Sequence, residues 1–192
     1  MTHSCIQDLH MHTVFSFGDS AIVEQQTVDF IASLRHAKTI GISDHFEYIT
    51  GHEFEVYRKA VLAHGFKLGT EVDGGDYTTD AAGYPFEYYV YHCRDVAGHY
   101  RGFERLLETG KPVIIAHPMA MGTDLEKLPE GCLVEINNRY IWRADWRRFY
   151  TPYLHRFRFL LSSDAHQPNW LNQNVARYVA SALGVAETMV FD

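Results

Sequence analysis

The sequence predicts an α/β fold in which short strands alternate with helices around a mostly parallel sheet. Short runs rich in β-branched and aromatic residues alternate with amphipathic segments from one end of the chain to the other, which is typical of repeated βα units. The 192 residues suffice for one well-buried domain and are few for two, and the apolar fraction of 46% is that of an ordinary globular protein. We therefore expect a single domain over residues 1–192.

Seven segments are predicted to be strands because each is short, apolar and bounded by polar or turn-forming residues. They are Cys5–Leu9, Thr39–Ser43, Phe66–Glu71, Phe86–His92, Pro112–Ala116, Leu133–Ile136 and Phe159–Ser163. Apolar residues at helical spacing predict helices over 96–107 and 171–183, and a glycine follows each of them. These apolar stripes are explained by packing on the sheet.

Composition excludes several classes of protein. No run of about 18 apolar residues is present to span a bilayer, and the N-terminus lacks a basic segment followed by an apolar one, so we expect a cytoplasmic protein without a membrane partner. The cysteines, Cys5, Cys93 and Cys132, have no Cys-x-x-Cys spacing. This argues against a disulfide framework and a zinc ribbon and favours reduced core residues.

The formal net charge of −7, without a Lys/Arg cluster, disfavours a long nucleic acid as partner. The sequence leaves open whether the chain forms a homo-oligomer.

The segment Asp8-Leu9-His10-Met11-His12-Thr13 is the most informative stretch of the chain. Side chains two residues apart on a strand face the same way, so the two imidazoles can converge on one metal ion. Nearly every other predicted strand also ends in a metal-capable residue, and in a parallel αβ barrel these ends meet at one mouth. The further residues are His45, Glu71, His92, His117, Glu135, Asp164 and His166.

These ordered motifs, from Asp8 to about His166, resemble the polymerase and histidinol phosphatase (PHP) family of metallohydrolases. The resemblance implies a distorted, seven-stranded (β/α)7 TIM-like barrel with a cluster of up to three metal ions at the carboxyl ends of its strands. It also implies a set of nine ligands. His10, His12, Glu71 and Asp164 would hold one metal; Glu71 would bridge to a second, held also by His92 and His117; Asp19, His45 and His166 would hold the third.

The chemistry of these residues agrees with a catalytic metal site. Imidazole and carboxylate ligands without thiolate suit Zn, Fe or Mn, so about two to three such divalent ions are the expected cofactors. The carboxylates Asp19, Glu71 and Asp164 offset only part of that charge, which favours an anionic substrate. We therefore expect a phosphoesterase acting on a small phosphorylated metabolite or nucleotide by attack of metal-bridging hydroxide on phosphorus, with monoesters slightly favoured over diesters.

Two alternatives remain from the sequence alone. One is a metallohydrolase acting on an amide or a lactone, because relatives specific for histidinol phosphate tend to carry an arginine soon after the histidine of the fifth strand, and here Pro118–Gly122 contains no basic residue. The other is a non-catalytic metal-binding module. Full occupancy of the ligand pattern argues against the latter.

Residues near the ligands are expected to support the site. Asp8 and Asp44 flank ligands and either orient imidazoles or cap turns and pair within the barrel. Glu135 is expected to form hydrogen bonds within the barrel mouth or to the substrate. For phosphate binding, Arg139 is the first candidate and Arg94 another. Arg143 also follows a strand, although the pattern equally predicts that it forms the solvated face of a helix together with Arg147 and Arg148.

Overall fold

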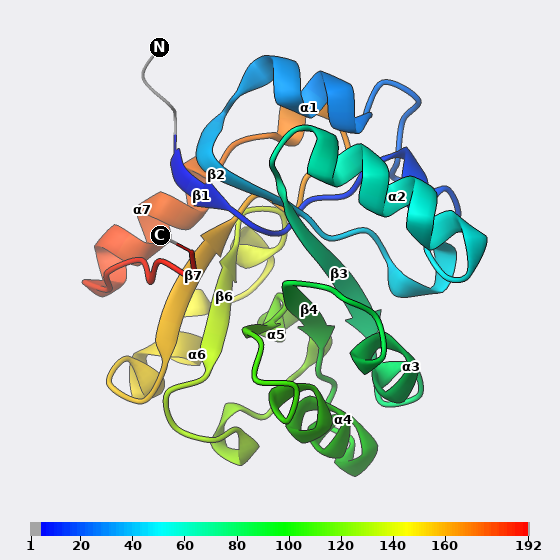
Figure 1. Cartoon of the computed structure of the whole chain (residues 1–192). Helices are drawn as coiled ribbons and strands as arrows, with labels where there is room; N and C mark the ends of the chain where they lie inside the picture. The colour runs from blue at the N-terminus through cyan, green and yellow to red at the C-terminus, as the bar shows by residue number, and fades with distance from the viewer. Residues whose placement is uncertain (1–4, 192) are drawn as a thin grey trace.

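A computed structural model of the chain, which describes residues 5–191, shows a barrel of parallel strands surrounded by helices (Figure 1). The seven strands follow one another in sequence order, and each pairs in parallel with the next. They are β1 (Cys5–Asp8), β2 (Ala37–Ile42), β3 (Lys67–Asp73), β4 (Tyr88–His92), β5 (Val113–Ile115), β6 (Leu133–Asn137) and β7 (Arg158–Ser162). The expected TIM-like α/β barrel is therefore confirmed, and every predicted strand is present.

The helices lie between the strands, as the alternating pattern predicts. They are α1 (Val28–Leu34), α2 (His52–Ala63), α3 (Thr78–Ala82), α4 (Ala97–Leu107), α5 (Pro118–Met121), α6 (Trp146–Tyr150) and α7 (Asn174–Leu183). The expected helix over 96–107 is α4, while α7 begins a few residues later than expected and ends at Gly184, which adopts φ +70°. Within residues 5–191 no helix is both long and apolar enough to cross a membrane.

The barrel is nearly closed, because its first and last strands meet beyond their carboxyl ends. Met11 forms an isolated parallel bridge with Ala165. The backbone N–H of Asp164 donates to the carbonyl of His10 at 2.8 Å, and that of His12 donates to the carbonyl of Ala165 at 2.9 Å. The two segments of this seam carry four of the predicted ligands, His10, His12, Asp164 and His166.

One large aromatic side chain occupies much of the barrel interior. Tyr88 of β4 is fully buried and its hydroxyl donates to the carbonyl of Leu9, on the other side of the barrel, at 2.8 Å. A Cβ at Gly69 would lie 2.2 Å from the Tyr88 ring, and one at Gly41 would lie 2.4 Å from its hydroxyl. Glycine is required at these two positions so that the ring can fit.

A second tyrosine fastens β2 to β3 where their pairing is short. Only Gly41 and Ile42 of β2 pair with Lys67 and Leu68 of β3. The buried hydroxyl of Tyr57, on α2, contacts the carbonyls of both Ile42 and Gly69, at 2.9 and 2.8 Å.

The remaining core packs between the sheet and the outer helices, and it contains the cysteines. Cys5, Cys93 and Cys132 are all buried, and burial raises the pKa of Cys93 to about 12. Within the described residues no disulfide connects them, as the sequence predicts.

Candidate metal centre

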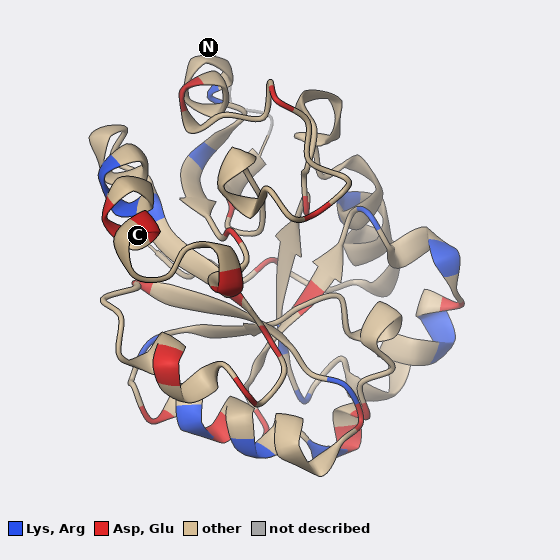
Figure 2. Ribbon diagram, turned by 90° about the vertical axis from the view of Figure 1, so that its right-hand side faces the viewer, with Lys and Arg blue, Asp and Glu red and all other residues tan. Residues whose placement is uncertain are grey.

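The predicted ligands converge at the carboxyl-terminal mouth of the barrel. His10 and His12 follow β1, His45 follows β2, Glu71 lies in β3 and His92 ends β4. His117 follows β5, Asp164 and His166 follow β7, and Asp19 lies in the loop after the short 3-10 helix η1 (Val14–Ser16). In Figure 2 carboxylate residues colour several central strands and loops, whereas Lys and Arg colour mainly the peripheral helices.

Glu71 lies at the centre of this cluster. Its Oε1 is 2.6 Å from Nε2 of His92, 3.1 Å from Nε2 of His10 and 3.4 Å from Nε2 of His117. Its Oε2 is 3.3 Å from Nε2 of His12 and 3.2 Å from Nδ1 of His45. One buried carboxylate thus faces five imidazoles, the arrangement expected of a bridging ligand.

Asp164 and Asp19 complete the cluster on its other side. Oδ1 of Asp164 lies 3.7 Å from Nε2 of both His10 and His12 and 3.3 Å from Nδ1 of His166. Oδ2 of Asp19 lies 2.9 Å from Nε2 of His166 and 3.6 Å from Nε2 of His45. The structure therefore brings together all nine residues of the predicted set.

The donor atoms form compact groups of the size that a metal ion needs. The ligand atoms within each group lie within 4.8 Å of one another. The groups are His10, Glu71 and His117; His10, His12 and Asp164; and His12, His45 and His166. Buried His/Glu/Asp clusters that could hold metal ions are therefore present at the barrel mouth.

Unpartnered polar atoms show that a cation fits this cluster. Oε1 of Glu71 and Oδ1 of Asp164 are buried and accept no hydrogen bond, although several imidazole nitrogens lie close to them. Such atoms cost free energy unless something compensates them, and six converging imidazoles cannot all direct an N–H at a carboxylate. A divalent cation would satisfy these oxygens and the imidazole lone pairs together.

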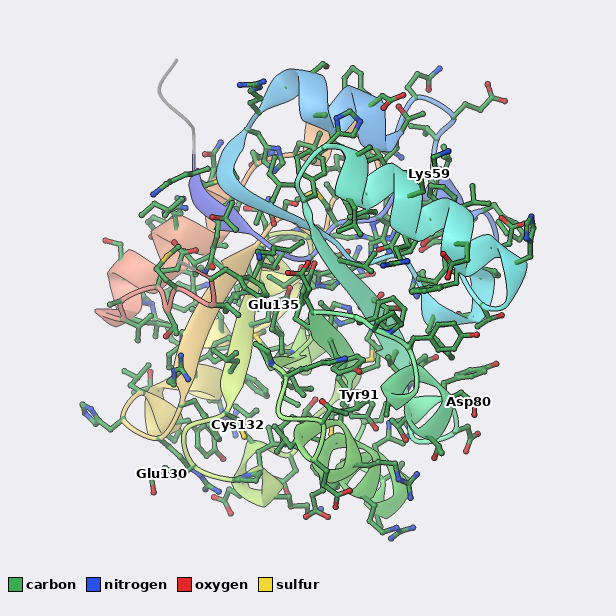
Figure 3. All side chains as sticks on the ribbon, in the orientation of Figure 1. Lys59, Asp80, Tyr91, Glu130, Cys132 and Glu135 are labelled. Carbon is green, nitrogen blue, oxygen red and sulfur yellow. The ribbon has the colours of Figure 1, made fainter. Side chains whose placement is uncertain are left out.

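Glu135 holds one side of the cluster in place, and Figure 3 shows it near the middle of the barrel. Its Oε1 lies 2.7 Å from Nδ1 of His10. Because a carboxylate only accepts, this contact keeps the proton of His10 on Nδ1 and turns Nε2 toward Glu71. Glu135 also accepts hydrogen bonds from the backbone N–H of His117, from Asn137 Nδ2 at 3.0 Å and from Ser162. Glu135 thus forms hydrogen bonds within the barrel mouth, as expected, and one of its partners is the predicted ligand His10.

Asp44 and Asp8 take different roles from one another. Asp44 accepts from the backbone N–H and the hydroxyl of Thr13, at 2.7 and 2.6 Å, and from the hydroxyl of Ser16 at 2.6 Å. Ser16 Oγ in turn lies 3.4 Å from Nδ1 of His12. Asp44 therefore caps a turn and, through Ser16, also supports the imidazole of His12. Asp8 instead accepts from the Ser163 backbone N–H at 3.0 Å and contacts His36, so it pairs within the barrel wall.

Asp73 was not expected from the sequence to contribute to the site. Its Oδ1 lies 3.4 Å from Nδ1 of His92 and 2.6 Å from Nη1 of Arg94. The predicted third strand stopped at Glu71, whereas β3 continues to Asp73 and places the two carboxylates on the same face. Asp73 follows Glu71 by two residues, and this spacing on a strand is the signal in the sequence that would have identified it.

Two of the predicted ligands have a backbone conformation that non-glycine residues rarely adopt. His117 has φ +23° and Asp164 has φ +51°. Such residues cost free energy and persist where the surroundings hold them, often at functional sites. Here the backbone N–H of His117 donates to Glu135, and that of Asp164 donates to the carbonyl of His10. Of the three described non-glycine residues with positive φ, these two lie where the chain directs a predicted ligand into the cluster, and the third, Arg35, ends α1.

The charges within the cluster are strongly coupled. Burial alone would lower the pKa of His92, but Glu71 and Asp73 outweigh it and raise the pKa to about 9. Burial would raise the pKa of Glu71, yet the neighbouring histidines, His92 first, hold it well below its usual range. Burial would also raise the pKa of Glu135, but the neighbouring His10 outweighs it and lowers this pKa to about 2. Without metal, the carboxylates of Glu71 and Glu135 are thus ionised at neutral pH and the imidazole of His92 is protonated.

His12 differs from its neighbours. Burial, followed by the charges of His166 and His45, lowers its pKa well below the usual range. His12 is therefore neutral at pH 7, which is the form of imidazole that binds metal.

Of the two arginines expected to bind substrate, only Arg139 reaches the cluster directly. Its Nη1 is 3.6 Å from Oδ1 of Asp164 and 3.1 Å from Nε2 of His166. Arg94 lies farther out, where it pairs with Asp73. The helix expected to carry Arg143, Arg147 and Arg148 is instead two short helices, η4 (Ile141–Arg143) and α6, because Asp145 caps a new helix start at α6.

Comparisons with known proteins do not identify this chain: no family model matches it, and no curated protein is significantly similar to it. Any functional conclusion therefore depends on the residues and geometry described above.

Proposed function

We propose that this protein is a metal-dependent phosphoesterase of the PHP type that hydrolyses a small phosphorylated metabolite or nucleotide, with monoesters favoured over diesters. The observation that carries the proposal is the buried carboxylate of Glu71, whose two oxygens face five imidazoles at the mouth of a seven-stranded barrel. Bound Zn, Fe or Mn ions would supply an activated water and neutralise negative charge on a phosphoryl group.

The chain itself performs the orienting work in this proposal. Glu135 fixes the tautomer of His10, and Ser16, held by Asp44, lies beside Nδ1 of His12, so two ligands of the same metal present their Nε2 atoms in a defined direction. Such preorganisation matters because a displaced ligand shifts the reacting atoms.

Arg139 provides the positive side chain for an anionic substrate. All its guanidinium contacts to polar groups within residues 5–191 are made through Nη1, so Nη2 and Nε are available to donate to phosphate oxygens. The guanidinium fork matches two such oxygens. Its side chain is 21% exposed, which leaves it in reach of solvent and substrate.

The test is phosphate release from a panel of mono- and diesters by protein loaded separately with Mn, Zn or Fe. We expect turnover of at least one monoester, and loss of at least about 100-fold in Glu71→Gln and His10→Ala. His155→Ala is the matched control, since His155 is exposed and precedes β7, whereas the predicted ligands Asp164 and His166 follow that strand at its other end.

Two results would overturn the proposal. Hydrolysis of an amide or lactone without hydrolysis of any phosphoester would favour the carbon-centred alternative, which the absence of a basic residue on α5 supports. Binding of metal with thermal stabilisation, but no hydrolysis of any substrate, would favour a non-catalytic module.

A further inference from the structure

Beside the candidate metal centre, arginine and aromatic side chains alternate in a continuous row. The guanidinium of Arg139 lies 5.1 Å from the ring centroid of Trp170 and 4.9 Å from that of Tyr140. The guanidinium of Arg143 lies 4.6 Å from the Tyr140 centroid and 5.5 Å from that of Trp142. We call these five residues the arginine–aromatic stack.

The inner end of the stack touches ligands of the cluster. The Tyr140 ring centroid is 4.9 Å from that of His117, and the Trp170 centroid is 6.1 Å from that of His166. The stack is built by the loops that follow β6 and β7, including η4 and the 3-10 helix η6 (Pro168–Trp170). In a parallel barrel these loops surround the substrate.

The outer end of the stack is open to solvent. Trp142 is 65% exposed, so packing within the chain does not account for it. Arg143 is also exposed and forms no ion pair with any described carboxylate. A cation and an apolar ring left together at the surface of an acidic chain form a site for a ligand that is both anionic and flat.

We propose that the arginine–aromatic stack binds the base of a nucleotide whose phosphate is held by Arg139 and the metal centre. This inference rests on the proposed function and narrows its substrate to phosphoesters that carry an aromatic ring. Nucleobases stack on both aromatic rings and guanidinium planes. An aliphatic phosphate would reach Arg139 but would gain nothing from Tyr140, Arg143 and Trp142.

The length of the stack favours a nucleotide over a simple aryl phosphate. Trp142, the exposed face, is separated from Arg139 by Tyr140 and Arg143, with successive distances of 4.9, 4.6 and 5.5 Å along the row. A ring joined directly to the phosphate oxygen would remain at the inner end. The sugar of a nucleotide sets the base away from the phosphorus and brings it toward Trp142.

Binding is measured first, because it does not require turnover. Calorimetric titration of metal-free protein with adenosine monophosphate, adenosine and glycerol phosphate should give binding in that order of decreasing affinity. We expect Trp142→Ala and Trp142→Leu to weaken adenosine monophosphate binding about 5- to 10-fold. Trp142→Phe should restore most of it, because phenylalanine keeps a flat ring and leucine does not. Tyr178→Ala is the matched control: Tyr178 is 64% exposed and lies outside the stack.

The kinetic experiment separates failure of this inference from failure of the proposed function. In metal-loaded protein, Trp142→Ala should lower the ratio of kcat/KM for adenosine monophosphate to kcat/KM for glycerol phosphate at least about fivefold. Turnover with an unchanged ratio and unchanged binding would overturn the stack and leave the phosphoesterase standing. Absence of turnover, with base binding still dependent on Trp142, would overturn the phosphoesterase and leave the stack standing.

Discussion

Metal ions are expected to stabilise this protein strongly, since the cluster contains buried carboxylate oxygens that lack partners. The perturbation is addition of Mn or Zn to chelator-treated protein, followed by thermal unfolding. Oε1 of Glu71 and Oδ1 of Asp164 belong to two donor groups that share His10, so an ion bound in either group would satisfy one of these oxygens. One ion present at 1,000 times its Kd contributes about 4 kcal/mol. For a chain of this size we then expect a Tm increase of about 8 to 16 °C.

The matched variant is Glu71→Gln, which keeps the shape of the side chain and removes its charge. Glutamine presents one oxygen instead of two, so it cannot serve both groups of imidazoles that now face Oε1 and Oε2. We expect the metal-induced rise in Tm to fall to less than about half of the wild-type value, and His155→Ala to retain it in full. An equal rise in wild type and Glu71→Gln would refute the assignment of Glu71 as the shared ligand.

Two further predictions concern the protein without metal and its core. The pKa of His92 is about 9 in the folded chain and about 6.5 when unfolded, so its protonation stabilises the fold fully below about pH 6.5 and this contribution is lost as the pH rises to 9. The free energy of unfolding of the metal-free protein, measured by urea titration, should therefore fall by up to about 3 kcal/mol between these pH values. An equally steep fall with pH in His92→Gln would show that His92 is not its cause. Gly69→Ala should destabilise the barrel by about 1 to 3 kcal/mol in the same assay, because its Cβ would lie 2.2 Å from the Tyr88 ring. In the control Gly98→Ala, a helical position whose nearest neighbour would be 3.9 Å away, stability should rise by about 0.5 to 1 kcal/mol, and equal effects at the two glycines would show that the ring is not confined.

The strands and the positions of the ligands could be predicted because both depend on local signals. A strand of three to seven residues is recognisable as a short apolar run, and residues that follow parallel strands must gather at one mouth. His10 and His12 illustrate this: spacing alone placed them on one side, and the barrel then brought Glu71 and Asp164 to them.

Other features depend on tertiary geometry and have no local signal. The selection of Glu135 as the partner of His10 depends on closure of the barrel, which leaves only β7 between β6 and β1, and no spacing in the sequence encodes it. The difference between Asp8 and Asp44 has a similar cause. Both flank a histidine in the sequence, but the Asp44 side chain faces the turn that contains Ser16, whereas the Asp8 side chain faces His36 and the Ser163 backbone.

The seam between β1 and β7 has a consequence for the order in which the site is made. His10 and His12 leave the ribosome more than 150 residues before Asp164, whose backbone N–H donates to the carbonyl of His10. Contacts of such large sequence separation form late in folding. During that interval a nascent chain carries His10, His12 and Glu71 without Asp164, the fourth residue predicted to hold the same metal ion. Closing of the barrel and completion of the ligand set are a single event, so the chain gains its full capacity for metal only once its last strand has docked.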